Sequence, residues 1–384
     1  MVTITLKPKK SNPFRLGHPW VFSGAVADVA GSPIAGDWVR VVDEHTTLLG
    51  YGFFNPHSLY RVRLISTCLS DMAQCITHHL KRALERRQAC GLPNTTTDAY
   101  RLCNSEGDQL SVLTIDVYGN SCVIAPSAYW VTRHQTLIEQ AVRNLLPQHT
   151  LYWKPIPKPL SQDGWNEALS LTQEAIALDV TEHALTYRIV PTHQKTGFFC
   201  DQRENRYRIR QFAAGRRVLD ICCYTGGFAL NAARAGAKHV IGIDSSSTAI
   251  ATAQDNAERN QLTIDFQERD AFDALKACEP VDVICLDPPK IAPSRHHITK
   301  ALRYYTELHQ LALEKLTDNG ILLTCSCSAS ITALDLVRSL QEAAHRTQRT
   351  LSVLMHTRAG PDHPVAPALF DTTDYLQAVW VHVA

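Results

Sequence analysis

The 384-residue sequence lacks a long apolar run, although hydrophobic residues make up 45% of it. A helix that spans a membrane needs about 20 consecutive apolar residues, and no segment supplies them. The Lys-rich start, Met1–Ser11, also lacks the apolar centre of a secretion signal. We therefore expect no membrane partner and a cytoplasmic location.

The sequence also lacks an excess of charge of one sign, because 38 Lys and Arg residues face 37 Asp and Glu residues. Overall charge therefore neither favours nor excludes a nucleic-acid partner. Locally, residues 188–217 contain many basic residues and only two acidic ones. The basic residues are Arg188, Lys195, Arg203, Arg206, Arg208, Arg210, Arg216 and Arg217. They indicate a basic patch, although part of the run can equally be a solvated helix face.

Paired cysteine motifs are missing, although the chain has 12 cysteines. No Cys-x-x-Cys occurs, and the closest pairs are Cys222-Cys223 and Cys325-x-Cys327. The cysteines are scattered through apolar segments and not spaced as a disulfide framework, so we expect reduced thiols. The spacing also predicts no metal site.

Three segments differ in pattern, and we predict three domains: 1–70, 71–180 and 181–384. The first reads as short strands broken by glycines, which is typical of a small β-barrel. The second combines a helix near 71–90, strands near 110–117 and 121–125 and a helix near 132–146, and it gives no indication of function. The third alternates strands and helices, which predicts an α/β fold with a parallel sheet covered by helices on both faces. We expect its seven strands at 217–221, 239–243, 264–268, 281–286, 321–325, 351–355 and 375–383.

The first strand of the third domain leads into a glycine turn. Asp220 lies at its end, and the turn runs through Cys222, Tyr224, Thr225, Gly226, Gly227 and Phe228 to a helix. Ligands of such sheets bind at the carboxyl ends of the strands, where glycine lets the backbone come close. The turn lacks Gly-x-Gly-x-x-Gly, which disfavours a dinucleotide.

Acidic residues also end the next two strands, at Asp244 and at Asp270, which precedes Ala271. A carboxylate at the second strand end can accept both ribose hydroxyls, and one at the third can meet an adenine amino group. The series suits adenosine that carries an uncharged or sulfonium tail. Each aspartate alone is as typical of a turn or a helix cap.

The fourth and fifth strands end in Asp287-Pro288-Pro289-Lys290 and in Ser326-Cys327-Ser328. The two prolines hold the chain extended after the carboxylate. The first motif is similar to the Asp/Asn-Pro-Pro-aromatic pattern of enzymes that methylate base amino groups, but Lys290 replaces the aromatic residue. Methylation of cytosine C5 needs a thiolate that first adds to C6, and a cysteine at this strand end suits that role. A buried structural thiol is the alternative.

The whole chain resembles the bacterial large-subunit rRNA methyltransferase I family. Six blocks, in order, carry the resemblance: His18–Ala25, Lys195–Arg203, Tyr224–Phe228, Asp287–Lys290, Ser326–Ser328 and Asp362–Pro364. The resemblance implies an N-terminal RNA-binding PUA domain and a class I, Rossmann-like methyltransferase domain. It further implies S-adenosyl-L-methionine as methyl donor and 23S rRNA as the partner that is methylated at cytosine C5.

The resemblance also assigns roles to residues. Cys327, more than Cys325, would be the nucleophile, Asp287 would hold the cytosine amino group and N3, and Lys290 would lie near the base or a phosphate. Lys195, Phe198 and Gln202 would join the strand-end residues at the cofactor. His18, Trp20, Arg203 and Arg206 would contact RNA.

Two other functions stay open at this point. A related fold could methylate guanine, which would need no cysteine. A non-catalytic RNA-binding or ribosome assembly factor could retain the barrel and an idle pocket, but it would have no need of the acidic series and the cysteine. A homodimer is also left open.

Overall fold

The structure, a computed structural model, describes residues 1–167, 176–191, 196–292 and 295–384. Its described residues form two compact units. Unit 1 contains Met1–Val180, Ile189–Phe198 and Pro361–Phe370, and unit 2 contains Thr181–Arg188, Phe199–Gly360 and Asp371–Ala384. The two units therefore interleave along the sequence, and the predicted domain boundaries at 70 and 180 stay predictions.

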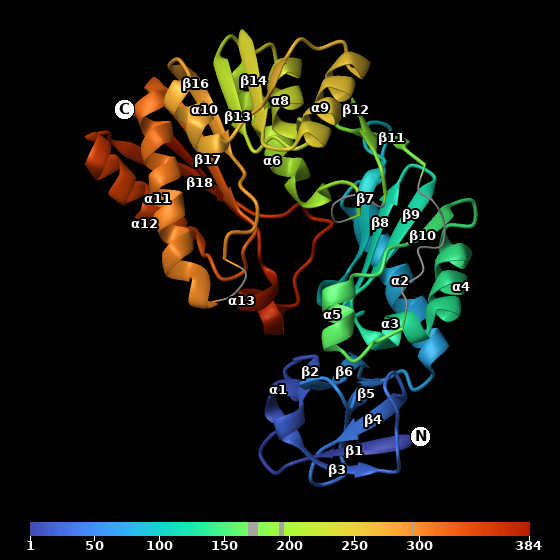
Figure 1. Ribbon diagram of the computed structural model, residues 1–384. Coiled ribbons are helices and arrows are strands. Elements are labelled where there is room, and N and C mark those ends of the chain that lie inside the picture. Colours follow the sequence, from blue (N-terminus) through green and yellow to red (C-terminus); the bar gives the residue numbers. More distant parts are fainter. Residues whose placement is uncertain (168–175, 192–195, 293–294) are drawn as a thin grey trace. The chain divides into compact units, whose positions relative to one another are not determined.

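A six-stranded sheet opens unit 1, with strand order β2-β6-β5-β4-β1-β3. Figure 1 shows it curled at the N-terminal end of the chain. Alternate residues such as Ile4, Leu6, Val39 and Val41 point into its core. The elements are β1 (Val2–Leu6), α1 (Asn12–Arg15), β2 (Trp20–Phe22), η1 (Ser23–Ala25), β3 (Val26–Ala30), β4 (Trp38–Val42), β5 (Leu48–Phe54) and β6 (Tyr60–Ser66).

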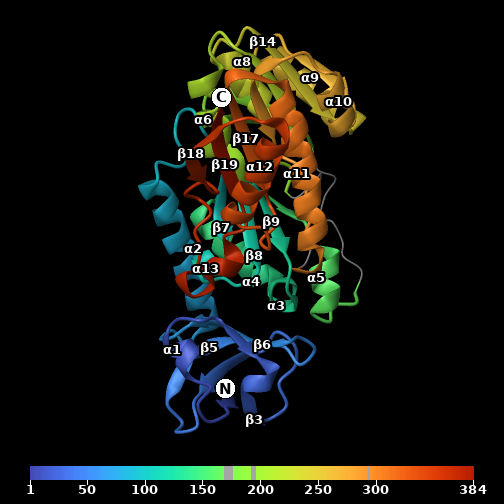
Figure 2. The ribbon, with the colours of Figure 1, turned by 90° about the vertical axis from the view of Figure 1, so that its left-hand side faces the viewer.

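A four-stranded sheet, in the order β10-β9-β8-β7, forms the rest of unit 1. The long helix α2 packs on β7 and beside α4 (Figure 2). It begins where the Asp71 carboxylate accepts the Gln74 N–H at 2.7 Å. The elements are α2 (Met72–Ala89), β7 (Ala99–Asn104), η2 (Ser105–Asp108), β8 (Leu113–Tyr118), β9 (Ser121–Pro126), α3 (Tyr129–Arg133), α4 (Gln135–Leu145), β10 (Thr150–Trp153) and α5 (Pro157–Gln162).

Unit 2 is built on a seven-stranded sheet with strand order β15-β14-β13-β16-β17-β19-β18. Its strands are β13 (Arg217–Ile221), β14 (His239–Asp244), β15 (Asp265–Glu268), β16 (Val281–Leu286), β17 (Leu316–Ser326), β18 (Leu351–Thr357) and β19 (Gln377–Val383). The expectation of a parallel sheet is wrong for one strand, because β19 runs antiparallel to both β17 and β18. A hairpin of β11 (Leu178–Glu182) and β12 (Leu185–Ile189) precedes this sheet.

Helices cover the sheet of unit 2. One group packs together as α6 (Arg203–Arg208), α7 (Arg210–Ala213), α8 (Gly227–Arg234) and α9 (Ser247–Arg259), and η3 (Cys200–Gln202) precedes it. The other group is α10 (Ala271–Ala277), α11 (Ile298–Lys315) and α12 (Ala333–Thr347). The short elements η4 (Arg295–His297), η5 (Pro367–Leu369) and α13 (Phe370–Thr373) lie in connecting segments. The main core lies between the sheet and α10–α12 and includes Leu219, Ile284, Leu308 and Leu322.

Strand register brings the predicted site residues to one edge of this sheet. Ile221, the last residue of β13, pairs with Ile243 of β14 and Leu286 of β16, and Leu286 pairs with Thr324 of β17. Parallel strands in register end together, so the loops that follow them share one edge.

Candidate functional site: the strand ends of unit 2

The loop after β13 has an unusual backbone. Cys222, Tyr224 and Gly226 all have positive φ, at 61°, 50° and 83°. Left-handed backbone is costly for residues with a side chain, so the surroundings must hold it. One such contact is the Tyr224 N–H, which donates to Asp244 Oδ2 at 2.9 Å. The loop is thereby fixed to the end of β14.

Asp220 is fully buried at the end of β13. Its Oδ2 accepts the Ala229 N–H of α8 at 2.9 Å, while Oδ1 receives no hydrogen bond from any nitrogen or hydroxyl of the described residues. Burial raises the pKa of this carboxyl from 3.8 to about 8, and the nearby Asp287 charge contributes to the rise. A buried acceptor without a nitrogen or hydroxyl donor is a position where a ligand donor or cation would be stabilised.

Asp244 and Asp270 differ from Asp220 because they are accessible. Asp244 is half-buried, and it accepts Tyr224 N–H through Oδ2 and Ser246 N–H through Oδ1. Asp270 is exposed and caps α10, where Oδ1 accepts the N–H groups of Phe272 and Asp273 at 2.8 and 3.2 Å. The helix-cap interpretation therefore holds for Asp270, and a ligand role for either residue would use the remaining lone pairs.

The glycines of the turn make room for protein side chains. A Cβ on Gly226 would lie 2.8 Å from Cζ of Phe266, and one on Gly227 would lie 2.5 Å from Cδ of Arg206. At both glycines the close approach is made by side chains of the same unit, and a role of these glycines at the cofactor stays a prediction.

Two further residues of the turn are buried. Phe228 packs inside α8, and Thr225 is 6% exposed with its carbonyl bonded to the Asn256 amide at 3.1 Å. Both side chains are buried, and their assignment to the cofactor stays a prediction. Cys222, Tyr224 and Ala271 are half-buried at the same edge.

Asp287 follows β16 and forms a hydrogen bond with the side-chain amide of Gln202, a predicted cofactor-binding residue. Gln202 Nε2 donates to Asp287 Oδ2 at 3.0 Å, and Asn205 Nδ2 donates to Gln202 Oε1 at 2.7 Å. Lys290, three residues later, is exposed. The Ala292 N–H then donates to Ser328 Oγ at 3.3 Å, which ties the loop after β16 to the loop after β17.

The two candidate sulfurs at β17 differ in accessibility. Cys325 is fully buried within the strand, where burial raises the pKa of its thiol well above the usual value, and the charge of Asp287 raises it further. Cys327 follows the last residue of β17 and is half-buried. Only a thiolate is a good nucleophile, so Cys325 is unsuited to that role.

The two arginines that are predicted to contact RNA, Arg203 and Arg206, are buried in the structure. Arg206 is 5% exposed in its side chain and forms a two-pronged ion pair with Glu182, at 2.7 and 2.6 Å. Arg203 is fully buried, with Nε 3.4 Å from Glu204 Oε1. Arg210 donates to Asn231 Oδ1 at 2.7 Å. The run is therefore neither one free basic patch nor a fully solvated face.

The other predicted residues lie in unit 1 or outside the described residues. Phe198 is buried in unit 1, and Lys195 lies outside the described residues. In the first sheet, His18 Nδ1 accepts the Trp20 N–H at 3.2 Å, and Trp20 Nε1 donates to Glu106 of η2 at 2.9 Å. Trp20 therefore has a structural contact in addition to any role with RNA.

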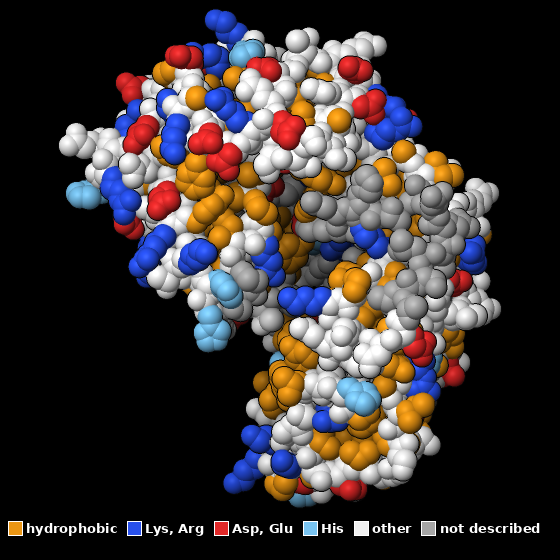
Figure 3. Space-filling view, viewed as in Figure 1, with side chains coloured by type: hydrophobic (Ala, Val, Ile, Leu, Met, Phe, Trp, Pro, Cys, Tyr) orange, Lys and Arg blue, Asp and Glu red, His pale blue; other side chains and the backbone are white. Residues whose placement is uncertain are grey.

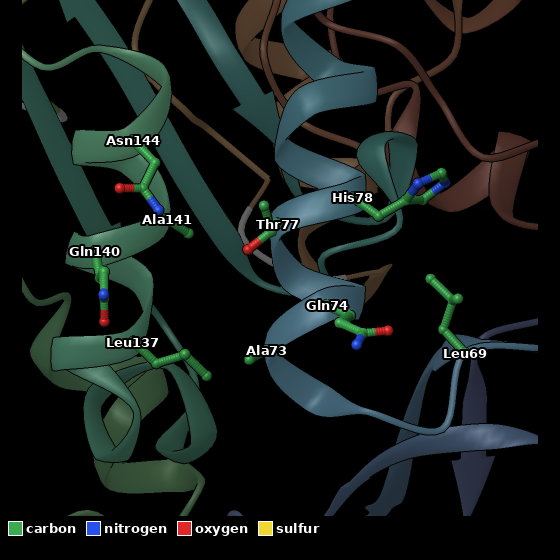
Figure 4. Close-up of a pocket in the computed structure, with 9 residues that line it drawn as sticks. All are labelled: Leu69, Ala73, Gln74, Thr77, His78, Leu137, Gln140, Ala141 and Asn144. Atoms are coloured by element: carbon green, nitrogen blue, oxygen red, sulfur yellow. The ribbon is translucent and has the colours of Figure 1, made fainter.

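A groove between α2 and α4 has a volume of about 570 Å³ and lies in unit 1 (Figure 4). Neutral side chains such as Gln74, Thr77, Gln140 and Asn144 line it, without acidic residues, lysine or arginine. It therefore lacks the chemistry of the strand-end site. Among the described residues, no His, Cys, Asp or Glu cluster could hold a metal ion, and no helix is long and apolar enough to cross a membrane.

Comparison with known proteins identifies the family. Residues 4–67 match a family described as PUA-like domain, and residues 157–370 match one described as S-adenosylmethionine-dependent methyltransferase. Ribosomal RNA large subunit methyltransferase I of Tolumonas auensis is 33% identical over 381 residues, which cover 95% of each chain. The Erwinia tasmaniensis protein of the same name is 32% identical over 366 residues, 91% of each chain. The chain belongs to this family.

Solved structures support the same fold. A Streptococcus mutans protein described as a SAM-dependent methyltransferase superposes with a TM-score of 0.81 at 20% identity, over 100% of both chains. The methyltransferase SMU.776, solved with SAH, gives 0.83 at 20% identity, also over 100% of both chains. The family of this chain uses S-adenosylmethionine, and the buried, undersatisfied Asp220 and the accessible Asp244 fit that cofactor.

Sequence reasoning missed residues that act behind the site. Asn205, Thr357 and Trp380 form a hydrogen-bonded series that ends on Gln202. No motif marks them, because they come from α6, β18 and β19, and only the folded sheet brings them together.

Proposed function

We propose that the protein transfers a methyl group from S-adenosylmethionine to C5 of a cytosine in 23S rRNA, with Cys327 as nucleophile. The observation that carries this proposal is the difference in accessibility between two cysteines at the end of β17. Cys325 is fully buried within the strand, and Cys327 follows its last residue and is half-buried. The hydrogen bond from Ala292 to Ser328 holds the Cys327 loop against the loop of Asp287. The names of the relatives, which are ribosomal RNA large subunit methyltransferases, support RNA of the large subunit as substrate.

The proposed chemistry assigns one step to each side chain. S-adenosylmethionine, when bound, supplies an electrophilic methyl group. The Cys327 thiolate adds to cytosine C6, and the electron pair of the C5–C6 double bond becomes available at C5 for the new carbon–carbon bond. Loss of the C5 proton to a base then restores the double bond and expels the Cys327 sulfur. Asp287 would accept a hydrogen bond from the cytosine amino group, and a second one from N3 once N3 has taken up a proton from water, which neutralises the negative charge that develops in the ring.

Cofactor binding would use the strand ends. Asp244, which is half-buried, would accept the ribose hydroxyls, and the exposed Asp270 would meet the adenine amino group. The buried Asp220 would face the cationic end of the cofactor. Lys290 is exposed beside Asp287 and would meet an RNA phosphate.

The test is methylation of RNA from cells that lack the protein, with labelled donor and analysis of the product nucleoside. Wild type and Cys325→Ala should form 5-methylcytosine, whereas Cys327→Ala should lose on the order of 10³-fold or more in rate. RNA with 5-fluorocytosine at the target should trap wild type, but not Cys327→Ala, in a covalent adduct. Release of the cysteine requires loss of a proton from C5, and fluorine occupies that position. Methylguanine as the product, or full activity of Cys327→Ala, would refute the proposal.

A further inference from the structure

A continuous series of hydrogen bonds connects the core of unit 2 to Asp287. Trp380 Nε1 donates to Thr357 Oγ1 at 3.1 Å, and Thr357 Oγ1 donates to Asn205 Oδ1 at 2.6 Å. Asn205 Nδ2 donates to Gln202 Oε1 at 2.7 Å, and Gln202 Nε2 donates to Asp287 Oδ2 at 3.0 Å. The series crosses β19, β18, α6 and η3 before it reaches the loop after β16.

The first member sets the direction of every later bond. An indole N–H can only donate, so the Thr357 oxygen accepts, and its single proton is left for another acceptor. Asn205 Oδ1 at 2.6 Å is a closer acceptor than the Ala378 carbonyl at 3.4 Å. With its oxygen on Thr357, Asn205 presents its NH₂ group to Gln202. Gln202 must then accept with its oxygen and direct its own NH₂ group at Asp287.

Burial makes the reverse orientation costly. Trp380 and Asn205 are fully buried, and Gln202 is 3% exposed, so water cannot replace a lost partner. A flipped Gln202 amide would place its oxygen against the Asp287 carboxylate and its NH₂ group against the NH₂ group of Asn205. Burying polar groups without partners is unfavourable, so one orientation of the amide is kept.

We infer that Gln202 is a positioning residue that keeps Asp287 ionised and fixes its carboxylate, with its own orientation imposed by Asn205, Thr357 and Trp380. This inference rests on the role of Asp287 under the proposed function. A donor to a carboxylate favours the charged form. An ionised Asp287 can accept the cytosine amino group, whereas a protonated one presents a hydrogen to it.

Thr357 offers the sharpest test, because three hydrogen bonds of the series separate it from Asp287. Thr357→Val removes the hydroxyl, and Thr357→Ser keeps it. Gln202→Met removes the donor itself at similar length. The pKa of Asp287 is measured directly from the infrared band of its protonated carboxyl, assigned by difference with Asp287→Asn. The acidic limb of the methylation rate against pH is the second readout.

The expected result is a graded upward shift of both readouts. Gln202→Met should raise the Asp287 pKa by about one unit, Thr357→Val by less, and Thr357→Ser should restore the wild-type value. The rate at neutral pH should fall about tenfold in Gln202→Met, with the KM for S-adenosylmethionine changed less than kcat. Thr347→Val is the matched control, because its half-buried hydroxyl bonds only to carbonyls of α12. It should shift neither readout.

Two outcomes would overturn the inference. One is an Asp287 pKa and an acidic limb of the pH–rate profile that stay at their wild-type values in Gln202→Met or in Thr357→Val, whatever the activity of the variant. The other is a loss of activity that Thr357→Ser does not restore, which would indicate packing alone. The infrared titration needs no RNA, and the acidic limb can be followed for any methylated base. A product other than 5-methylcytosine would therefore refute the proposed function and leave this test intact.

Discussion

At the scale of single residues, burial of the Asp220 carboxyl carries an electrostatic cost at the strand ends. The carboxyl is fully buried, and burial raises its pKa to about 8. In the unfolded chain the same group ionises near its ordinary value of 3.8. Between these two values the folded protein holds a proton that the unfolded chain has released. The free energy of unfolding therefore decreases as pH rises from about 4 to about 8.

Asp220→Asn should remove this dependence, because an amide cannot ionise and its oxygen can still accept the Ala229 N–H. Without cofactor, the variant should gain stability relative to wild type by up to about 1.4 kcal/mol for each pH unit between 5 and 7. Urea unfolding of both proteins at several pH values measures this difference. Asp265→Asn, a change at an exposed carboxylate of β15, is the control and should show no such trend. A constant difference for Asp220→Asn would contradict the buried, protonated state.

At the scale of elements, local pattern predicted most strands of the sheet in unit 2. The expected ranges 217–221 and 281–286 match β13 and β16, because buried parallel strands are continuous apolar runs. In unit 1 the sequence does not predict β7, because Arg101 interrupts the apolar residues of this strand. Asp116 on neighbouring β8 bonds both arms of Arg101, at 2.8 and 2.9 Å. Asp116, 15 residues later in the sequence, neutralises the Arg101 charge in the folded sheet. In the sequence alone, an unpaired charge at Arg101 argues against a buried strand.

The same limit explains the errors at the site. Sequence placed Asp220, Asp244 and Asp287 at strand ends, since each directly follows or closes an apolar run. It could not tell a buried arginine from an exposed one, because the partner of Arg206 is Glu182 on another element. Nor could it find Thr357 or Trp380, whose contacts depend on the antiparallel insertion of β19.

With Arg203 and Arg206 buried, α11 offers a more accessible basic surface. No Asp or Glu occurs between Asp287 and Glu307. Lys290, His296, Lys300 and Arg303 are exposed in this segment, and Lys300 and Arg303 lie one turn apart. Figure 3 shows Lys, Arg and His side chains close together where α11 begins. The segment starts directly at the predicted catalytic Asp287, so RNA bound there would pass its phosphates along this surface.

The double change Lys300→Ala and Arg303→Ala should weaken RNA binding mainly at low salt. Each lost phosphate contact should reduce the slope of log affinity against log salt by about 0.7 for single-stranded RNA. Binding titrations at several salt concentrations measure the slope. The control pair is Lys276→Ala and Arg338→Ala, which removes exposed charges from α10 and α12. An equal slope for the two double variants would exclude α11 as the RNA-binding surface.

At the scale of the whole molecule, the late segment Pro361–Phe370 belongs to unit 1. Asp362 is fully buried, and its Oδ2 accepts the Arg101 N–H of β7 at 2.9 Å. Its carbonyl accepts from Arg87 of α2 at 2.8 Å, and the Pro364 carbonyl accepts from Asn104 at 2.9 Å. Gly107 is needed for this approach, because a Cβ there would lie 1.9 Å from the Pro364 oxygen. Unit 1 is therefore completed by residues from the last tenth of the sequence.

A change at Asp362 should consequently loosen a sheet that lies 260 residues earlier. Asp362→Ala leaves the half-buried Arg101 N–H without this acceptor, a cost of about 1 kcal/mol. Hydrogen exchange followed by mass spectrometry should show faster exchange in β7 and the end of α2, with β13, β16 and β17 unchanged. Asp371→Ala, an exposed carboxylate assigned to unit 2, should leave β7 protected. Faster exchange confined to the seven-stranded sheet would mean that this segment stabilises unit 2 instead.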